Sequence, residues 1–286
     1  MRSADDERPR PIRDLLRRLI KAPAAFSVLW PALLIIGGYV AWHRWGSVHV
    51  AARYSGIDPT RIEITPPPEY VRSNIVKAVY RDTAMEGLSL LDRQATAKIA
   101  AAFSMHPLIR QVTGVRKLPG GTIDVRLEYR SPVAMVHVFK PDRNDTRSYF
   151  FPVDGEGILL PDTEFAPAEI PNYLYIEIPD VYSTNDAGTP FGDRRVEAAA
   201  RLAEILQPLR DQAMLRSIGV HGGSWQSDTP QLELTTDSGA RLFWGSPPGS
   251  ELPGEPTVTM KLRTLLAVDK SQNADLRMAG GVTLQR

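Results

Sequence analysis

The sequence predicts an α+β protein with a transmembrane helix near its N-terminus. Residues 22–42 carry no charged side chain, whereas farther along the chain apolar residues recur with helical and strand periods in turn. The composition, 43% hydrophobic and 23% charged, is that of a globular protein, so most of the chain should fold. A length of 286 residues allows about two domains.

The apolar run at 22–42 is the first element. A helix of that length spans about 30 Å at ~1.5 Å per residue, which matches the hydrocarbon core of a bilayer. A cleaved signal peptide has a shorter apolar region, ~7–15 residues, so we expect an uncleaved helix over 22–45 that contacts the lipid bilayer. Basic residues stay on the cytoplasmic side, and the run is preceded by Arg2, Arg8, Arg10, Arg13, Arg17, Arg18 and Lys21. The expected arrangement is a cytoplasmic tail at 1–21, a single pass through the cell inner membrane, and extracytoplasmic (periplasmic) domains after it.

The first extracytoplasmic domain is predicted at 58–138. Its helices carry apolar residues on one face, and Asp92 is expected to cap the second of them. Its last strand alternates apolar and charged residues, as a sheet with one wet face requires. The predicted order is strand, helix, helix, strand and strand, over 61–65, 69–80, 92–105, 112–118 and 122–138.

The remaining residues, 139–286, are predicted to form a second mixed domain rich in strands. A strand, a glycine-containing turn and another strand are expected over 149–160. Amphipathic periodicity predicts helices at 194–209 and 257–268. The other predicted strands lie at 173–178, 216–220, 231–235, 240–244 and 281–286.

Several short motifs follow one another along the chain. They are Leu90-Leu91-Asp92, Arg130-Ser131-Pro132-Val133-Ala134, Val153-Asp154-Gly155, Lys261-Leu262 and Asp275-Leu276-Arg277. In this order they resemble the FtsQ/DivIB family of bacterial cell-division proteins, which has one membrane span, a POTRA domain and a β-rich domain. The chain departs from the family at Pro107-Leu108-Ile109, where a Trp is missing, and in the loops at 179–192 and 245–256.

The resemblance implies a scaffold of the septum-forming division machinery. Its implied partners are division membrane proteins of the FtsB and FtsL type, bound by addition of a strand to an exposed sheet edge. The family's partner contact lies at the C-terminal strand, so the expected partner-binding residues are Gly281, Val282, Thr283, Leu284, Gln285 and Arg286. The alternative is a POTRA-type accessory of protein transport or envelope assembly.

The sequence offers no recognisable catalytic constellation. Without cysteines there is no thiolate nucleophile or thiolate metal site, and no two of the five histidines lie at i,i+4 on a predicted helix. Asp154 and Glu156 could form a paired carboxylate, but acidic residues beside glycines are common in turns. A formal net charge of +1 gives no field that favours nucleic acid. We therefore expect no enzyme activity, cofactor, metal, nucleic acid or small-molecule substrate.

Overall fold

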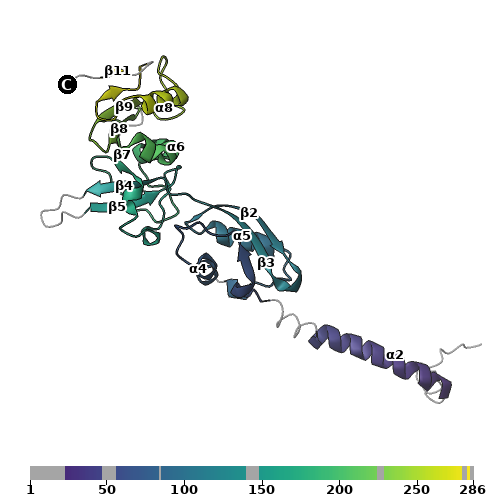
Figure 1. Cartoon of the computed structure of the whole chain (residues 1–286). Coiled ribbons are helices and arrows are strands. Elements are labelled where there is room, and N and C mark those ends of the chain that lie inside the picture. Colours follow the sequence, from purple (N-terminus) through teal and green to yellow (C-terminus); the bar gives the residue numbers. More distant parts are fainter. Residues whose placement is uncertain are drawn as a thin grey trace, which may run out of the picture. The chain divides into compact units, whose positions relative to one another are not determined.

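The computed structural model of the chain is α+β with two separate sheets, as the periodicity predicts (Figure 1). It describes residues 23–46, 56–83, 85–139, 148–223, 229–278 and 282–283. The chain divides into two compact units, one of Met1–Ile57 with Glu86–Ala95 and one of Asp58–Met85 with Thr96–Arg286. Both sheets belong to the second unit.

The main element of the first unit is the helix α2 (Pro23–Ala41), which continues into a short π-helix, η1 (Trp42–Gly46). Pro31 lies inside α2, and the Gly37-Gly38 pair adds no apolar side chain to it. Of the helices in the part of the chain that the structure describes, none is both long and apolar enough to cross a membrane. The transmembrane helix predicted over 22–45 is therefore wrong, and so is the inner-membrane location that was derived from it.

The smaller sheet has three strands. Its elements are β1 (Ile62–Ile64), α4 (Ile75–Asp82), α5 (Ala95–Ser104), β2 (Ile109–Lys117) and β3 (Ile123–Tyr129), with 3-10 turns at η2 (Pro59–Arg61), η3 (Met85–Gly87) and η4 (Pro119–Gly121). β3 is central, parallel to β1 and antiparallel to β2. Ile123, Val125 and Leu127 of β3 are buried, because alternate residues of a strand point to the same face.

Side chains bond the backbone at the start of α4 and in the turn that precedes α5. α4 starts later than the predicted residue 69, because the side-chain oxygen of Asn74 accepts a hydrogen bond from the Lys77 N–H at 2.9 Å. Asp92 accepts one from the Gln94 N–H at 2.9 Å, just before α5.

The larger sheet has eight strands in the order β11-β10-β9-β8-β7-β6-β4-β5. Parallel pairs join β4 to β6, β6 to β7 and β9 to β10, and the other neighbours are antiparallel. The strands are β4 (Ala134–Phe139), β5 (Ser148–Val153), β6 (Leu174–Glu177), β7 (Leu215–His221), β8 (Gln231–Thr236), β9 (Arg241–Gly245), β10 (Ala274–Asp275) and β11 (Val282–Thr283). The helices are α6 (Arg194–Leu206), α7 (Arg210–Ala213) and α8 (Val258–Ala267), with η5 (Asp162–Glu164), η6 (Ile170–Asn172) and η7 (Gln207–Leu209).

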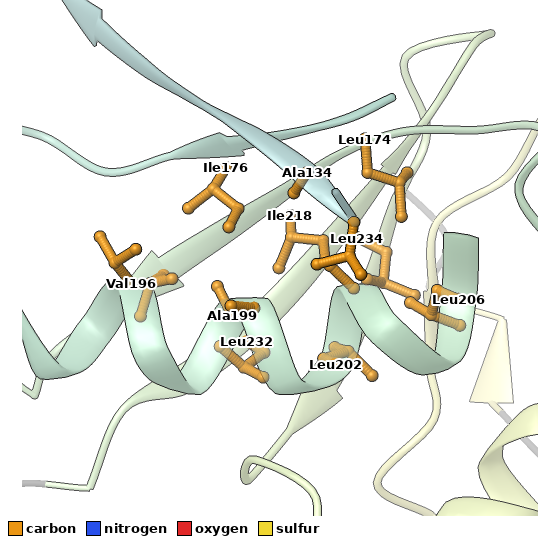
Figure 2. Packing of buried hydrophobic residues seen from close by; sticks show 14 of the residues in the cluster. Ala134, Leu174, Ile176, Val196, Ala199, Leu202, Leu206, Ile218, Leu232 and Leu234 are labelled. Atoms are coloured by element: carbon orange, nitrogen blue, oxygen red, sulfur yellow. The ribbon is translucent and has the colours of Figure 1, made fainter. Parts of the chain in front are cut away.

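Helix α6 covers one face of the larger sheet and forms the main core with it. Its buried residues recur every three or four positions, which gives the helix one continuous apolar face. Figure 2 shows this face against strand residues of the sheet, and the labelled members of the cluster are Ala134, Leu174, Ile176, Val196, Ala199, Leu202, Leu206, Ile218, Leu232 and Leu234. Burial on the order of 1.5–3 kcal/mol for each large apolar side chain makes this contact the main stabilising feature of the sheet.

The strand predicted over 122–138 is wrong as a single element. β3 ends at Tyr129 in the smaller sheet, whereas β4 begins at Ala134 and lies between β5 and β6 in the larger one. Pro132 has no N–H to continue a ladder, and the next residue, Val133, already donates to the carbonyl oxygen of Val153 at 2.9 Å. The larger sheet therefore begins inside the range 58–138 that was predicted for the first domain.

Candidate partner-binding edge

The C-terminal strand forms one end of the larger sheet. β11 is last in the strand order, and its register with β10 pairs Ala274 with Thr283 and Asp275 with Val282. Because β11 is an edge strand, half of its backbone N–H and C=O groups point away from β10 and can bind a further strand. Of the predicted partner-binding residues, Val282 and Thr283 form β11, whereas Gly281, Leu284, Gln285 and Arg286 lie outside the residues that the structure describes.

The strand β10, which carries β11, is short but firmly attached to the core. Ala274 and Asp275 pair in parallel with Leu242 and Phe243 of β9. The backbone N–H of Leu276 then donates to the Phe243 carbonyl oxygen at 2.9 Å, and the Leu276 side chain is buried in the main core. The Asp275-Leu276-Arg277 motif therefore fixes the position of the edge.

An ion pair closes the turn after β10. The carboxylate of Asp275 accepts hydrogen bonds from the backbone N–H of Arg277 (2.9 Å) and from its Nε (2.9 Å) and Nη2 (2.6 Å). The side-chain bonds lower the pKa of Asp275 against the opposing effect of burial, and they raise the pKa of Arg277. The guanidinium also lies over the Phe243 ring, 5.6 Å from its centroid, so it packs on the open face of β9.

A second ion pair, Glu255 with Lys261, lies in the interior beside this turn. Lys261 on α8 is fully buried, its Nζ is 2.5 Å from Glu255 Oε1, and it lies 5.1 Å from the centre of the Trp244 ring. Glu255 also accepts hydrogen bonds from the backbone N–H groups of Ser246 (2.8 Å) and Leu252 (2.9 Å). Burial raises the pKa of Glu255, but these hydrogen bonds outweigh it and lower the pKa to about 2. The pair ties the 245–256 loop to α8.

Gly245 links the two ion pairs to the end of β9. Its φ of 93° lies in the left-handed region, which glycine adopts without steric cost. A Cβ at this position would clash with Glu255 Oε1 and would come within 2.7 Å of Arg277 Cγ. The glycine that follows Trp244 in the sequence is therefore required by the close approach of both side chains.

Asp154 and Glu156, the two acidic residues of the turn after β5, are held by hydrogen bonds within the fold. Asp154 accepts hydrogen bonds from the backbone N–H groups of Glu156 and Ile158, both at 2.9 Å, so it closes the turn after β5. Arg130 donates to Asp154 Oδ2 at 2.6 Å and to Glu156 Oε2 at 3.1 Å. The bond from Arg130, helped by Arg110, lowers the pKa of Glu156 against the opposing effect of burial. Both carboxylates are therefore held by arginines at the connection between the two sheets.

Sequence reasoning missed the Glu255–Lys261 pair. In the sequence, Lys261 belongs to a helix motif that resembles the family, and Glu255 lies in a loop that diverges from the family. Charged residues are normally expected at the surface, so no periodic signal indicates a buried pair. The sequence feature next to this pair is Trp244, which stands directly before a glycine and a proline-rich loop.

Among the described residues there is no cluster of acidic and histidine side chains that could hold a metal ion.

Comparisons with known proteins find sequence similarity over only part of the chain. No family model matches the chain. A glycine cleavage system H protein of Synechococcus sp. (strain CC9902) is 28% identical over 102 residues, which cover 30% of this chain and 78% of that protein. The glycine cleavage system H protein of Bacillus cereus (strain B4264) is 28% identical over 107 residues, covering 31% of this chain and 83% of that protein. A likeness of this extent leaves most of the chain unmatched and does not define its family.

Proposed function

We propose that this chain is a protein-binding scaffold of the cell-division machinery, which holds a partner by strand addition at β11. The position of β11 at the end of the eight-stranded sheet carries the proposal, because an edge strand offers unpaired backbone groups to a second chain. The motifs that resemble the FtsQ/DivIB family support the same edge, and they imply partners of the FtsB and FtsL type.

The ion pairs beside the edge support this function because they hold β10, the strand with which β11 pairs, to the rest of the domain. Strand addition orders the incoming segment, and a preformed edge reduces the entropy lost on binding. Asp275 binds Arg277 directly after β10, and the Glu255–Lys261 pair ties the neighbouring loop to α8.

Paired proline substitutions test the edge. Successive residues of a strand direct their N–H groups to opposite sides, so one of Val282 and Thr283 donates toward β10 and the other away from it. Val282→Pro and Thr283→Pro each remove one donor. We expect the variant that loses the outward donor to keep its melting temperature and lose at least tenfold in affinity for an FtsB-type partner from the same organism. A Ser148→Pro variant, at the first residue of the opposite edge strand β5, is the matched control and should bind normally.

Two outcomes distinguish the alternatives. If both proline variants and a chain lacking 281–286 bind the partner normally, the β11 edge is not the docking site. Binding that maps instead to β1 or β2, the edges of the three-stranded sheet, would favour the transport or envelope-assembly accessory.

A further inference from the structure

The face of the larger sheet that points away from α6 carries an open groove. Alternation directs Ile176, Ile218 and Leu234 toward α6 (Figure 2), so their strand neighbours point to the opposite side. On that side lies a groove of about 720 Å³ across β4, β6, β7, β8 and β9. Its lining includes His137, Glu177, Gly219, His221, Glu233 and Arg241.

Strand register aligns four groove residues in one row. His137 pairs with Glu177, Glu177 with Gly219, and Gly219 with Glu233, and paired residues point to the same face. Neighbouring strands lie ~4.8 Å apart, so the backbones of the two glutamates are separated by about 10 Å. Gly219 stands between them without a side chain. The row is therefore a slot one strand wide with a carboxylate on each side.

One of these carboxylates, that of Glu233, is largely buried and is held by two long ion pairs. The Glu233 side chain is 9% exposed, and no hydrogen bond from a described residue reaches its oxygens. The nearest cationic atoms are His221 Nε2 at 3.4 Å and Arg241 Nε at 3.6 Å, on side chains that are 63% and 65% exposed. The cations of both pairs are exposed to solvent, which weakens their hold on the carboxylate. Glu233 is therefore paired only through long contacts with two exposed cations, and a further cationic donor in the groove can compete for its oxygens.

Two other polar residues of the row, His137 and Glu177, also line the groove. Nε2 of His137, in the same row, is buried and has no hydrogen-bond partner among the described residues. Glu177 receives a hydrogen bond from the Ser217 hydroxyl at 3.1 Å, and the residue lines the groove. With Asp180 included, three carboxylates and one guanidinium, that of Arg241, line the groove. The charge of the groove is therefore complementary to a cation.

We propose that this groove binds the guanidinium group of an arginine side chain presented by a partner protein. A guanidinium is planar and has five N–H donors in a fixed fork, so it can donate to Glu177 and Glu233 together while lying flat over Gly219. An ammonium group is a compact point charge and reaches one side of the slot at a time. The site is on the sheet face, separate from the β11 edge, and does not depend on the proposed scaffold function.

Titration of the full-length protein with N-acetyl-arginine amide tests this site. We expect the backbone amide signals of Gly219 and Glu233 to shift and saturate with a dissociation constant on the order of 1 mM, as expected for a ligand of about fifteen heavy atoms. N-acetyl-citrulline amide has nearly the same shape without the charge and should give no saturating shift. An equal response to N-acetyl-lysine amide would overturn the guanidinium assignment.

Matched variants distinguish binding in the slot from general electrostatic attraction to the protein surface. Glu233→Gln keeps the shape of the side chain and should lower the affinity for the arginine probe at least fivefold. Arg241→Gln removes a competing cation and should leave the affinity equal or higher. Gly219→Val should fill the slot and abolish binding without unfolding the sheet, because an added Cβ would lie 3.8 Å from its nearest neighbour, the Glu233 carbonyl oxygen. Probe binding that survives Gly219→Val in a folded protein would refute the site.

Discussion

Replacing Lys261 with methionine should destabilise the larger sheet at neutral pH, because it leaves Glu255 buried without its cation. The Glu255 side chain is 7% exposed and that of Lys261 is fully buried. Breaking a buried pair by removing one partner costs about 3–5 kcal/mol. Burial raises the pKa of Glu255, but the hydrogen bonds from Lys261, Leu252 and Ser246 together lower it to about 2, so the folded protein favours the charged carboxylate that Lys261 neutralises.

The pH dependence of this loss has a definite sign. Because the pKa of Glu255 is lower in the folded state than in the unfolded state, its contribution is complete above pH 4.5 and disappears as the pH falls toward about 2. Urea unfolding of the full chain, followed by tryptophan fluorescence, should therefore show a loss of about 3 kcal/mol at pH 7 that shrinks between pH 4.5 and pH 2. The Trp244 ring beside Lys261 makes the fluorescence sensitive to the unfolding of this region.

Two controls complete the experiment. Arg116→Gln breaks an exposed pair with Asp124 and should cost less than about 1 kcal/mol. The double variant Lys261→Met with Glu255→Leu replaces both charges by apolar groups and should recover most of the lost stability. If Lys261→Met unfolds within about 1 kcal/mol of the parent protein at pH 7, the interpretation of the pair as a stabilising contact is wrong.

Three further substitutions test other contacts. Leu127→Asp puts a charge on the buried face of β3 and should cost several kcal/mol, measured as loss of a cooperative thermal transition; unchanged melting would show that the face is misassigned. Gly245→Ala forces a side chain into the left-handed region and against Arg277, and should lower stability by about 1–3 kcal/mol in urea. Arg130→Gln leaves the buried Asp154 carboxylate without its cation, and we expect about 3 kcal/mol of destabilisation and faster proteolysis near Ser131-Pro132; equal cleavage rates would contradict this role.

Local patterns in the sequence predicted most elements but not their assignment to sheets. Alternation in β3 identified the buried residues Val125 and Leu127 correctly. β4, by contrast, is apolar at almost every position and is buried on both faces, and no local pattern in β3 or β4 shows that the chain changes sheets after Pro132. Side-chain periodicity records which face of a strand is buried, whereas strand neighbours depend on contacts between distant segments.

The wrong span at the N-terminus and the missed buried pair near the candidate edge have different causes. The length of the charge-free run, together with the basic residues before it, predicted a membrane span at 22–45, whereas no helix of the described residues is both long and apolar enough to cross a membrane. The resemblance to the family predicted an edge strand at the C-terminus. The Glu255–Lys261 pair could not be predicted, because nothing in a loop sequence indicates that a glutamate will accept three hydrogen bonds. The row of Glu177, Gly219 and Glu233 depends on strand register and is equally invisible in the sequence.

Hydrogen–deuterium exchange at β11 tests the central claim most directly. The measurement compares the exchange rates of the Val282 and Thr283 amides in the free protein and in the complex with an FtsB-type partner. Strand addition predicts that the amide directed away from β10 becomes protected at least tenfold in the complex, while exchange at Ser148 to Phe151 of the opposite edge is unchanged. A saturated complex in which both β11 amides exchange as fast as in the free protein would contradict the account.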